Sequence, residues 1–337
     1  MKRALAAVCL AIVSIGAIGA SACGGKKEKE HRAPPPEVTG LAAVPATAQV
    51  VIGIDVAKLA GSPIVARAAE QLLLREPSLA ESWAHVNDAC KIDVLKQVKH
   101  VVLALGPSTS AAGSGAVLAV ATGTLSEPDL ATCVRTMVGK GGGALTTKNV
   151  AGRSLYQVKD GNRVMHFGFG RPDTIVLGTD EAWVVEGLSA NKKVLDNPEM
   201  SGWLQKVDQY GPVFAVGRVD ERVGKGLVAA SGGKLTKPAQ AFFVNLDPTN
   251  GAKALLGVVM PDPEAAKQLE SFANKELLVA SVAAQIASLG PVVEKLQAKV
   301  EGNVLRFTVE LTMSEVNQLL SVLDEAKAPE QVTPPAK

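Results

Sequence analysis

One order of predicted elements occurs twice along this 337-residue chain, and it restricts the fold more than any other feature of the sequence. The first occurrence begins at 49–56, where every second residue is aliphatic, which is typical of a strand with one buried face. Ser62 followed by Pro63 predicts a helix start, because serine caps helices and proline suits the first helical position. A second helix and a strand pair are then predicted over 79–90, 100–105 and 116–121.

The first occurrence continues with a helix and a run of short strands. Ser126 and Asp129 form the Ser-x-x-acid pattern of a capping box, which predicts another helix start. In this helix Cys133 shares a face with apolar residues, so we expect its side chain to point inward. The run 145–178 indicates short antiparallel strands separated by turns, and a helix is predicted over 180–188.

The same order returns in the second part of the chain. Four strands are predicted there, and a helix starts at Asp262, a residue type that favours helix caps. A hairpin around Gly302-Asn303 and a last helix from Thr312 complete the set. The four strands are 213–219, 241–246, 252–260 and 305–311.

The strand over 305–311 indicates what kind of sheet to expect. Leu305, Phe307 and Val309 alternate with polar residues, so one side of the strand is apolar and the other is polar. This period is typical of antiparallel sheets with one face in water and helices on the other. The sequence therefore predicts an α+β fold of antiparallel sheets with helices on one face.

We interpret the recurrence as a tandem duplication of a β-α-β-β-α-β unit that has since diverged. In the order of its elements this unit resembles the ferredoxin-like split βαβ arrangement. The predicted halves are 42–200 and 201–326, and a disordered tail rich in proline follows over 327–337. The alternative is a single α+β domain in which the similarity of the two parts is coincidental.

The amino terminus has the three-part layout of an export signal. Lys2 and Arg3 precede an uncharged apolar run over 4–18, and small residues over 20–22 follow. This run is 15 residues long. A helix needs about 20 apolar residues to cross a bilayer core. Residues 1–22 are therefore predicted to be a signal peptide that is removed.

Cys23 directly follows these small residues and is itself followed by Gly24. The junction resembles the lipobox of bacterial lipoproteins, although the commonest pattern has leucine where Ala20 stands. The resemblance implies that the Cys23 thiol carries diacylglycerol, with palmitate among the acyl chains, and becomes the mature amino terminus. Several chains on one cysteine make a stable anchor, whereas one chain binds a membrane only marginally. The alternative is an ordinary secreted protein, cut after Ala22, in which Cys23 is incidental.

Residues 23–41 are predicted to be a tether. Mixed charges over 26–32 keep it solvated, and three prolines over 34–36 stiffen it, so it holds a folded body away from the bilayer. Under the lipoprotein resemblance, Gly24 in place of an aspartate implies the outer membrane. The expected location is the cell envelope, lipid-anchored at the outer membrane and facing the periplasm or the cell surface.

Charge and aromatic content restrict the partners. Removal of Lys2 and Arg3 from the 35 basic residues leaves 33, which equals the 33 acidic residues. A chain with no net charge and no basic patch lacks the positively charged surface that binds nucleic acid. Three Trp, two Tyr and seven Phe are too few for a stacking platform. The expected partners are the membrane, through lipid on Cys23, and a protein or an apolar ligand.

Two cysteines remain once Cys9 leaves with the signal and Cys23 is used for lipid. These are Cys90 and Cys133, and an even number in an oxidising compartment predicts one disulfide between them. The alternative is two buried thiols. Neither has a Cys-x-x-Cys neighbour, so a redox or zinc role is not expected.

The histidines do not form a recognisable metal or catalytic site. His31 lies in the tether, His85 lies near Asp88, and His100 begins a strand. His166 alternates with apolar neighbours and is expected to face solvent. A metal site needs several ligands at matched spacing, so no metal is assigned.

Other motifs are explained without catalysis. Ser-x-x-Lys patterns at Ser189 and Ser231 occur about as often as chance predicts, and their supporting elements are absent. The glycines over 139–143 follow a predicted helix and precede a strand, which reverses the dinucleotide-binding order. They therefore predict a helix stop and a loop. No catalytic residue and no cofactor is assigned.

Three functions remain open. The leading one is a non-enzymatic binding or interaction module at the envelope, supported by the anchor, the tether and the absence of a catalytic set. The second is a carrier of an apolar ligand or lipid, favoured by the many small aliphatic side chains. The third is a hydrolase whose site forms only in the folded chain, which requires a Ser or His within reach of a base in a pocket.

Overall fold

The structure is a computed structural model that divides the chain into two units, Met1–Pro34 and Pro35–Lys337. It describes residues 37–77, 80, 81, 84, 88, 90, 93–107, 115–140, 142–150, 152–286 and 290–325, all in the second unit. The predicted signal peptide, Cys23, the tether up to residue 36 and the tail from 327 lie outside these residues. So do His31, His85 and most of the helix predicted over 79–90.

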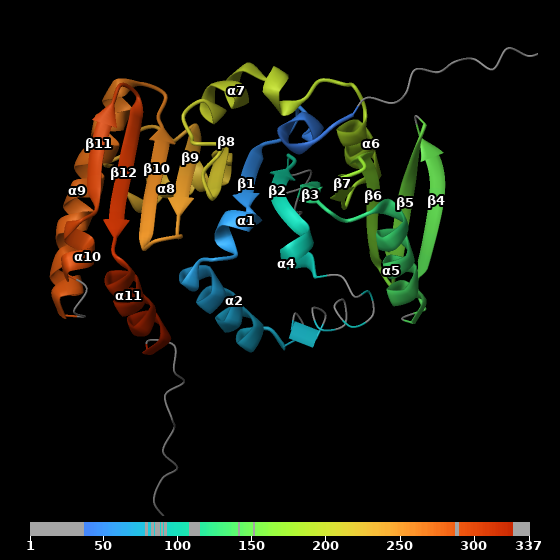
Figure 1. Cartoon of the computed structure of the whole chain (residues 1–337). Coiled ribbons are helices and arrows are strands. Elements are labelled where there is room, and N and C mark those ends of the chain that lie inside the picture. Colours follow the sequence, from blue (N-terminus) through green and yellow to red (C-terminus); the bar gives the residue numbers. More distant parts are fainter. Residues whose placement is uncertain are drawn as a thin grey trace, which may run out of the picture. The chain divides into compact units, whose positions relative to one another are not determined.

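Twelve strands of the described residues form one continuous sheet in which neighbours run antiparallel (Figure 1). The α+β class with an antiparallel sheet is therefore confirmed. The order across the sheet is β11-β12-β10-β9-β8-β1-β2-β3-β7-β6-β5-β4. The strands are β1 (Val50–Asp55), β2 (Val98–Leu105), β3 (Val117–Gly123), β4 (Ala144–Val150), β5 (Arg153–Asp160), β6 (Arg163–Arg171), β7 (Thr174–Gly178), β8 (Val213–Arg218), β9 (Ala241–Asp247), β10 (Ala252–Val259), β11 (Gln297–Glu301) and β12 (Val304–Leu311).

The helices lie in the connections between these strands. The α-helices are α1 (Val56–Leu59), α2 (Pro63–Arg75), α4 (Val94–Gln97), α5 (Glu127–Lys140), α6 (Glu181–Leu188), α7 (Pro198–Leu204), α8 (Glu221–Ala230), α9 (Pro263–Ile286), α10 (Gly290–Glu294) and α11 (Met313–Glu325). Two 3-10 helices are η1 (Gly40–Ala43) and η2 (Val194–Asp196).

The same strand order occurs in both parts of the sheet. In each part the first three strands are neighbours, and the third pairs with the last: β3 with β7, and β10 with β12. The two parts meet where β1 pairs with β8, with Val51 opposite Val216. This recurrence is topological, and the duplication itself stays a prediction.

The strands do not adopt the ferredoxin-like arrangement. In a split βαβ unit another strand separates the first two strands. Here β1 pairs directly with β2 in antiparallel fashion, with Asp55 opposite His100. The connection over 56–97 returns the chain to the sheet at the end where β1 stops, so β2 runs back along β1.

One face of the sheet, which we call the sealed face, carries the main core. Its Val51, Val176, Val216 and Phe243 have no exposed surface, and Val120 is 1% exposed. Helices α6 and α7 cover this face, and their buried residues Val184, Leu188, Met200 and Leu204 belong to the same core.

Helices also pack on the opposite face, so the prediction of helices on one face is wrong. Ala131 of α5 packs with Tyr156 and Phe167 there, and these two rings stack with centroids 4.6 Å apart. At the other edge, α9 packs on Val258 and Val300. The outer strands carry large apolar side chains on both faces, and each face needs a cover.

Helix starts follow the predicted capping chemistry. The Ser62 hydroxyl accepts a hydrogen bond from the Val65 N–H at 3.3 Å, and the Ser126 hydroxyl accepts one from the Asp129 N–H at 3.3 Å. The Asp262 carboxylate accepts the Ala265 N–H at 2.8 Å. The predicted glycine loop also holds, because α5 ends at Lys140 and β4 begins at Ala144.

Candidate functional site: the open face of the sheet

The second face of the six central strands is apolar, yet it remains partly exposed. We call it the open face, and its members are Ile52, Ile54, Val101, Leu103, Leu105, Ala119, Ala121, Val213, Ala215, Val244, Leu246, Ala254 and Leu256. Leu105, Leu246 and Leu256 are 37%, 36% and 38% exposed. The other members are half-buried. On the sealed face the same strands bury apolar side chains such as Val51, Val120, Phe214, Val216 and Phe243, while polar residues near the strand ends, such as His100 and Lys253, are exposed. The apolar side chains of the two faces therefore differ mainly in how far they are covered.

Register joins the open-face residues into rows. One row runs directly across six strands through Leu256, Val244, Ala215, Ile52, Leu103 and Ala119. At about 4.8 Å between strands this row extends for about 24 Å. The result is a broad aliphatic surface without a charged side chain among its members.

This surface offers apolar contact and no directional bonds. Its members carry no hydrogen-bonding side chain, and the backbone of the central strands is already paired on both sides. A peptide therefore cannot join the sheet here by strand addition, which needs a free edge. What remains is apolar burial, at about 1.5–3 kcal/mol for each fully covered large aliphatic side chain.

A sequence signal for this surface exists in the central strands. Val101 to Leu105 is an uninterrupted apolar run, and so is Val117 to Ala121. Such runs are typical of strands that are apolar on both faces, whereas β12 shows clear alternation. The expectation of one wet face came from β12 and does not hold for the centre of the sheet.

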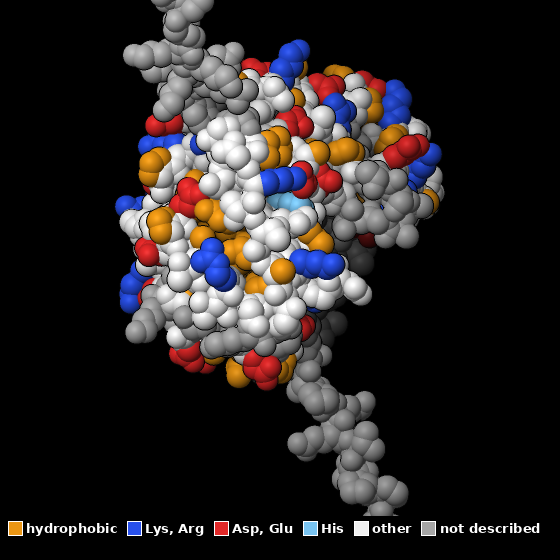
Figure 2. Space-filling view, turned by 90° about the vertical axis from the view of Figure 1, so that its right-hand side faces the viewer, with side chains coloured by type: hydrophobic (Ala, Val, Ile, Leu, Met, Phe, Trp, Pro, Cys, Tyr) orange, Lys and Arg blue, Asp and Glu red, His pale blue; other side chains and the backbone are white. Residues whose placement is uncertain are grey.

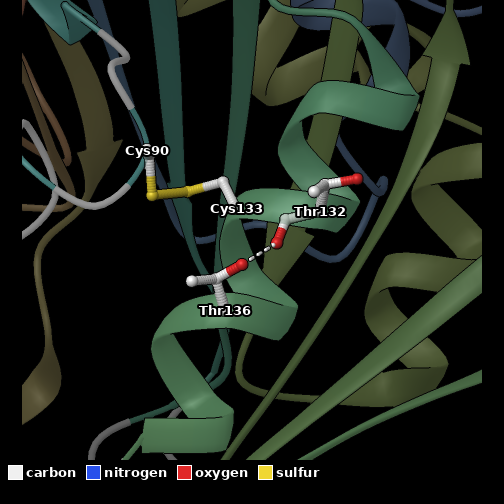
Figure 3. The surroundings of a disulfide bond; sticks show 4 residues. All are labelled: Cys90, Thr132, Cys133 and Thr136. Carbon is white, nitrogen blue, oxygen red and sulfur yellow. Dashed lines mark hydrogen bonds between the residues drawn. A yellow bond between two sulfur atoms is a disulfide. The ribbon is translucent and has the colours of Figure 1, made fainter.

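The connection between β1 and β2 is tied to the helix that packs on the open-face side. Cys90 in this connection and Cys133 on α5 lie at disulfide distance, with their Cα atoms 4.8 Å apart (Figure 3). Cys133 is 7% exposed and points inward as predicted. One turn away the Thr136 hydroxyl donates to the Thr132 carbonyl at 2.9 Å. The predicted pair is therefore placed for a bridge.

A pocket of about 440 Å³ lies on the sealed side, where β1 ends. His100 Nδ1 lies 3.7 Å from the Asp55 carboxylate, and both line the pocket with Lys58 and Tyr210. Burial works to raise the pKa of Asp55, but the Lys58 N–H bond and the charges of Lys58 and His100 outweigh it and leave this pKa lowered. The residues that line the pocket include no Ser, Thr or Cys. Outside the pocket lining, Thr122 is the cross-strand partner of His100, and its hydroxyl lies 3.3 Å from the Thr39 hydroxyl, in a hydrogen bond between the two threonines.

A larger hollow, of about 960 Å³, lies at the ends of β9, β10 and β12. The two lysines of its lining form ion pairs: Lys253 pairs with Glu310 at 2.8 Å, and Lys295 pairs with Glu315 at 2.7 Å. Its lining also includes the open-face members Val213, Leu246 and Ala254, so the hollow adjoins the open face, and the two ion pairs are exposed surface contacts.

The Ser-x-x-Lys serines have structural roles. The Ser231 hydroxyl donates to the Val228 carbonyl at 2.6 Å and accepts the Leu235 N–H at 2.9 Å. Lys234 lies 3.6 Å from Glu276 on α9. The Ser189 hydroxyl donates to the Glu186 carbonyl at 2.8 Å. Both serines therefore cap the C-terminal ends of helices.

His166 does not face solvent as predicted; it is 5% exposed. It lies on the sealed-face side of β6, and its Nδ1 has no hydrogen-bond partner, with Glu181 of α6 3.8 Å away. The expectation failed because both faces of β6 are covered, by α5 on one side and by α6 on the other.

Two further findings concern metal ligands and membrane spans in the described part of the chain. There, His, Cys, Asp and Glu residues form no group of three or more that could hold a metal ion. Among the same residues, no helix has the length and apolar character that crossing a membrane requires.

Hydrophobic side chains also reach the surface away from the open face. Figure 2 shows the side of the molecule that carries β4, where hydrophobic side chains gather in one area with Lys or Arg side chains around it. By exposure, β6 contributes Val164 and Met165, at 36% and 43%. Val164 and Met165 are consecutive residues of β6, so their side chains point to opposite faces of the sheet and form no row like that of the open face.

Comparison with known proteins gives structural likeness only at a low level of similarity. No protein-family model and no curated protein matches the chain. A solved structure described as "Structure of crystal form I of TP0453" is similar, with a TM-score of 0.45 and 12% identity, over 88% of this chain and 100% of that chain. At this level of similarity the comparison assigns neither a family nor a function, so the site must be judged from its own chemistry.

Proposed function

We propose that this protein is a membrane-anchored envelope lipoprotein, with lipid on Cys23, that binds an apolar ligand through the open face. The observation that carries this proposal is the open face itself: thirteen aliphatic side chains on six paired strands, with three leucines more than a third exposed. Soluble proteins rarely leave a large continuous apolar surface without a use for it.

Binding without catalysis is the second part of the proposal. The residues that line the pocket of the His100–Asp55 pair include no Ser, Thr or Cys, and the two serines of the Ser-x-x-Lys patterns are engaged in helix ends. A hydrolase needs a nucleophile within reach of a base, and these arrangements favour a binding role over a hydrolytic one.

An acyl chain suits the open face better than a protein partner does. Protein interfaces place aromatic and arginine anchors at their centres, with hydrogen bonds around them. The open-face members are Ile, Leu, Val and Ala, which offer no hydrogen bond, and the one ring beside them, Phe242 on the same side of β9, is half-buried. Its chemistry matches a lipid or fatty acid, so we favour the carrier over the protein-interaction module.

The anchor supplies the location. Lipid on Cys23 would hold the body at the cell envelope, and Gly24 favours the outer membrane under the lipoprotein resemblance. A Cys23→Ala variant should move into soluble fractions, and the mature wild-type chain should have a mass that includes lipid on its first residue. Continued membrane association of the variant, or an unmodified first residue in the wild type, would contradict the anchor.

Ligand binding is tested on the purified protein with a fluorescent fatty acid. Leu256→Gln places a polar group at the β10 end of the open-face row, on one of its three most exposed leucines, and should weaken binding by about 1.4 kcal/mol, or about tenfold. Leu195→Gln is the matched control, because Leu195 is 46% exposed and lies on η2, away from this face. Equal affinity of both variants, or no bound probe and no copurified lipid in native mass spectra, would refute the carrier.

A further inference from the structure

The sheet has two edges, because β11 and β4 each pair with only one neighbour among the described strands. The outer backbone groups of an edge strand can pair with a strand of another chain. Folded proteins normally prevent this with charged residues, prolines, bulges or a segment that covers the edge. The two edges of this sheet differ in such protection.

The β11 edge is protected. The Val300 N–H donates to the Glu270 carboxylate of α9 at 3.0 Å, so one outer backbone group of the strand is already bound. The same helix packs on the Val300 side chain. The strand has only five residues, and Lys299 and Glu301 place charges along it. A covering helix and charged side chains are the usual means of closing an edge.

The β4 edge lacks these features. Its seven residues, Ala144–Val150, pair with β5 in one uninterrupted register, without a bulge or a proline. Lys148 is the one charged residue of the strand, and it forms an ion pair with Glu181 of α6, over the sealed face. Beyond β4 the described chain places no further strand, and Figure 1 shows β4 outermost on its side of the molecule.

Three residues of β4 present their backbone groups to the outside. Val150 pairs with Arg153 across a two-residue turn, and the pair that closes such a turn exchanges both of its hydrogen bonds. Because bonding alternates along the strand, Leu145, Thr147 and Asn149 direct their N–H and C=O groups away from β5. The Thr147 and Asn149 side chains are exposed, so α5, which contacts β4, leaves this part of the edge uncovered.

The sequence of β4 suits pairing with a second copy of itself. Antiparallel pairing around a two-fold axis at Thr147 is the one register that pairs all seven residues. In this register each Lys148 lies opposite Thr146 of the second copy, and each Leu145 lies opposite Asn149, so no like charges face each other. The two Thr147 residues meet at the axis, and a threonine pair is favourable across antiparallel strands.

We propose that two copies of this protein form a symmetric dimer by pairing their β4 strands, so that the antiparallel sheet continues from one copy into the other. Backbone hydrogen bonds between the two edges carry the contact, as in other cases of strand addition. The dimer covers the unprotected edge of each copy and leaves the protected β11 edges at its ends. Seven paired residues make a small interface, so association should be reversible and depend on protein concentration. The inference depends neither on the apolar ligand nor on the lipid anchor.

Cysteine cross-linking tests the register in the full mature chain with Cys23→Ala, which removes any thiol or lipid at this position. In the proposed pairing the Cα atoms of the two copies are about 5.5 Å apart at position 147, which a disulfide can span, and about 14 Å apart at position 149. On mild oxidation Thr147→Cys should give a covalent dimer, and the matched control Asn149→Cys should not. The chain without either substitution, oxidised in parallel, reports any cross-link through Cys90 or Cys133.

Sedimentation at a series of protein concentrations measures the association itself. Thr147→Pro removes the N–H donors at the axis and should weaken the dimer by about tenfold. Ala298→Pro is the matched control, because it makes the same change on the β11 edge, two residues from Val300, and should leave association unchanged. If Thr147→Pro does not fold, the two cysteine variants decide. A monomer at every concentration, equal cross-linking at positions 147 and 149, or equal effects of the two prolines would overturn the inference.

Discussion

Gly53 on β1 and Phe214 on β8 are direct cross-strand partners, and the Phe214 ring occupies the space where a side chain at position 53 would lie. The pair sits at the seam where the two parts of the sheet meet. Gly257 and Phe243 on β10 and β9 show the same arrangement. In both pairs a glycine lets a large ring lie flat against the sheet and seal the core.

Gly53→Ala should therefore destabilise the protein. The added methyl group would overlap the Phe214 ring, which must move out of a packed core, at a cost of about 1–3 kcal/mol. Urea unfolding measures this loss. Gly226→Ala is the control, since a side chain at this position in α8 meets open space and alanine favours helix by about 0.5–1 kcal/mol. An unchanged midpoint for Gly53→Ala would show that the ring does not lie over residue 53.

Opening the Cys90–Cys133 pair should also lower stability. The two cysteines are 43 positions apart, and chain entropy alone predicts a loss of about 4 kcal/mol when such a loop is released. Urea unfolding of the protein with and without reductant measures it, and a Cys90→Ser/Cys133→Ser variant, insensitive to reductant, is the control. Quantitative thiol labelling of the denatured, unreduced protein would contradict the bridge.

Glu315 should make the attachment of α11 sensitive to acid. Hydrogen bonds from Lys295, from the Thr312 N–H and from the Thr312 hydroxyl lower the pKa of Glu315 from 4.5 to about 2. A lowered folded-state pKa gives stability that is complete above pH 4.5 and is lost as the pH falls towards about 2.

The Glu315→Gln variant should lack this contribution, so its unfolding free energy should change less than that of the wild type between pH 4.5 and pH 2. Urea unfolding at a series of pH values makes the comparison. Identical slopes for the two proteins across that interval would show that the Glu315 carboxylate is not held as described.

Local chemistry could be predicted from the sequence because it depends on neighbours in the chain. Ser62, Ser126 and Asp262 each cap the helix that they precede, and the strands occupy nearly the predicted segments. The pairing of Cys90 with Cys133 also followed from the sequence. Cys9 was assigned to the signal peptide and Cys23 to the lipid, so in the expected oxidising compartment these two cysteines were left to pair.

Which strands pair, and which helices cover each face of the sheet, could not be predicted, because both depend on segments far apart in the sequence. His166 looked solvent-exposed from its own strand, but α6 from residues 181–188 covers that side. The direct pairing of β1 with β2 depends on where the connection over 56–97 returns the chain. The open face could not be predicted for the same reason. Ile52 and Val51 are both apolar, and only the folded arrangement shows that Ile52 is half-buried and Val51 is fully buried.

Ser62 provides a last prediction, about how firmly α2 is held. Its buried hydroxyl both caps the helix and donates to the Pro248 carbonyl, so Ser62→Ala removes a cap and leaves a carbonyl without its partner. The expected cost is about 2–3 kcal/mol. Ser126→Ala is the matched control, because Ser126 caps α5 but donates to the Asp129 carboxylate at 2.6 Å in an exposed position, so about 1 kcal/mol is expected. Urea unfolding gives both values, and hydrogen exchange should show faster exchange of the α2 amides in Ser62→Ala alone. Equal losses in the two variants would mean that the bond to Pro248 does not hold α2 at this end of the sheet.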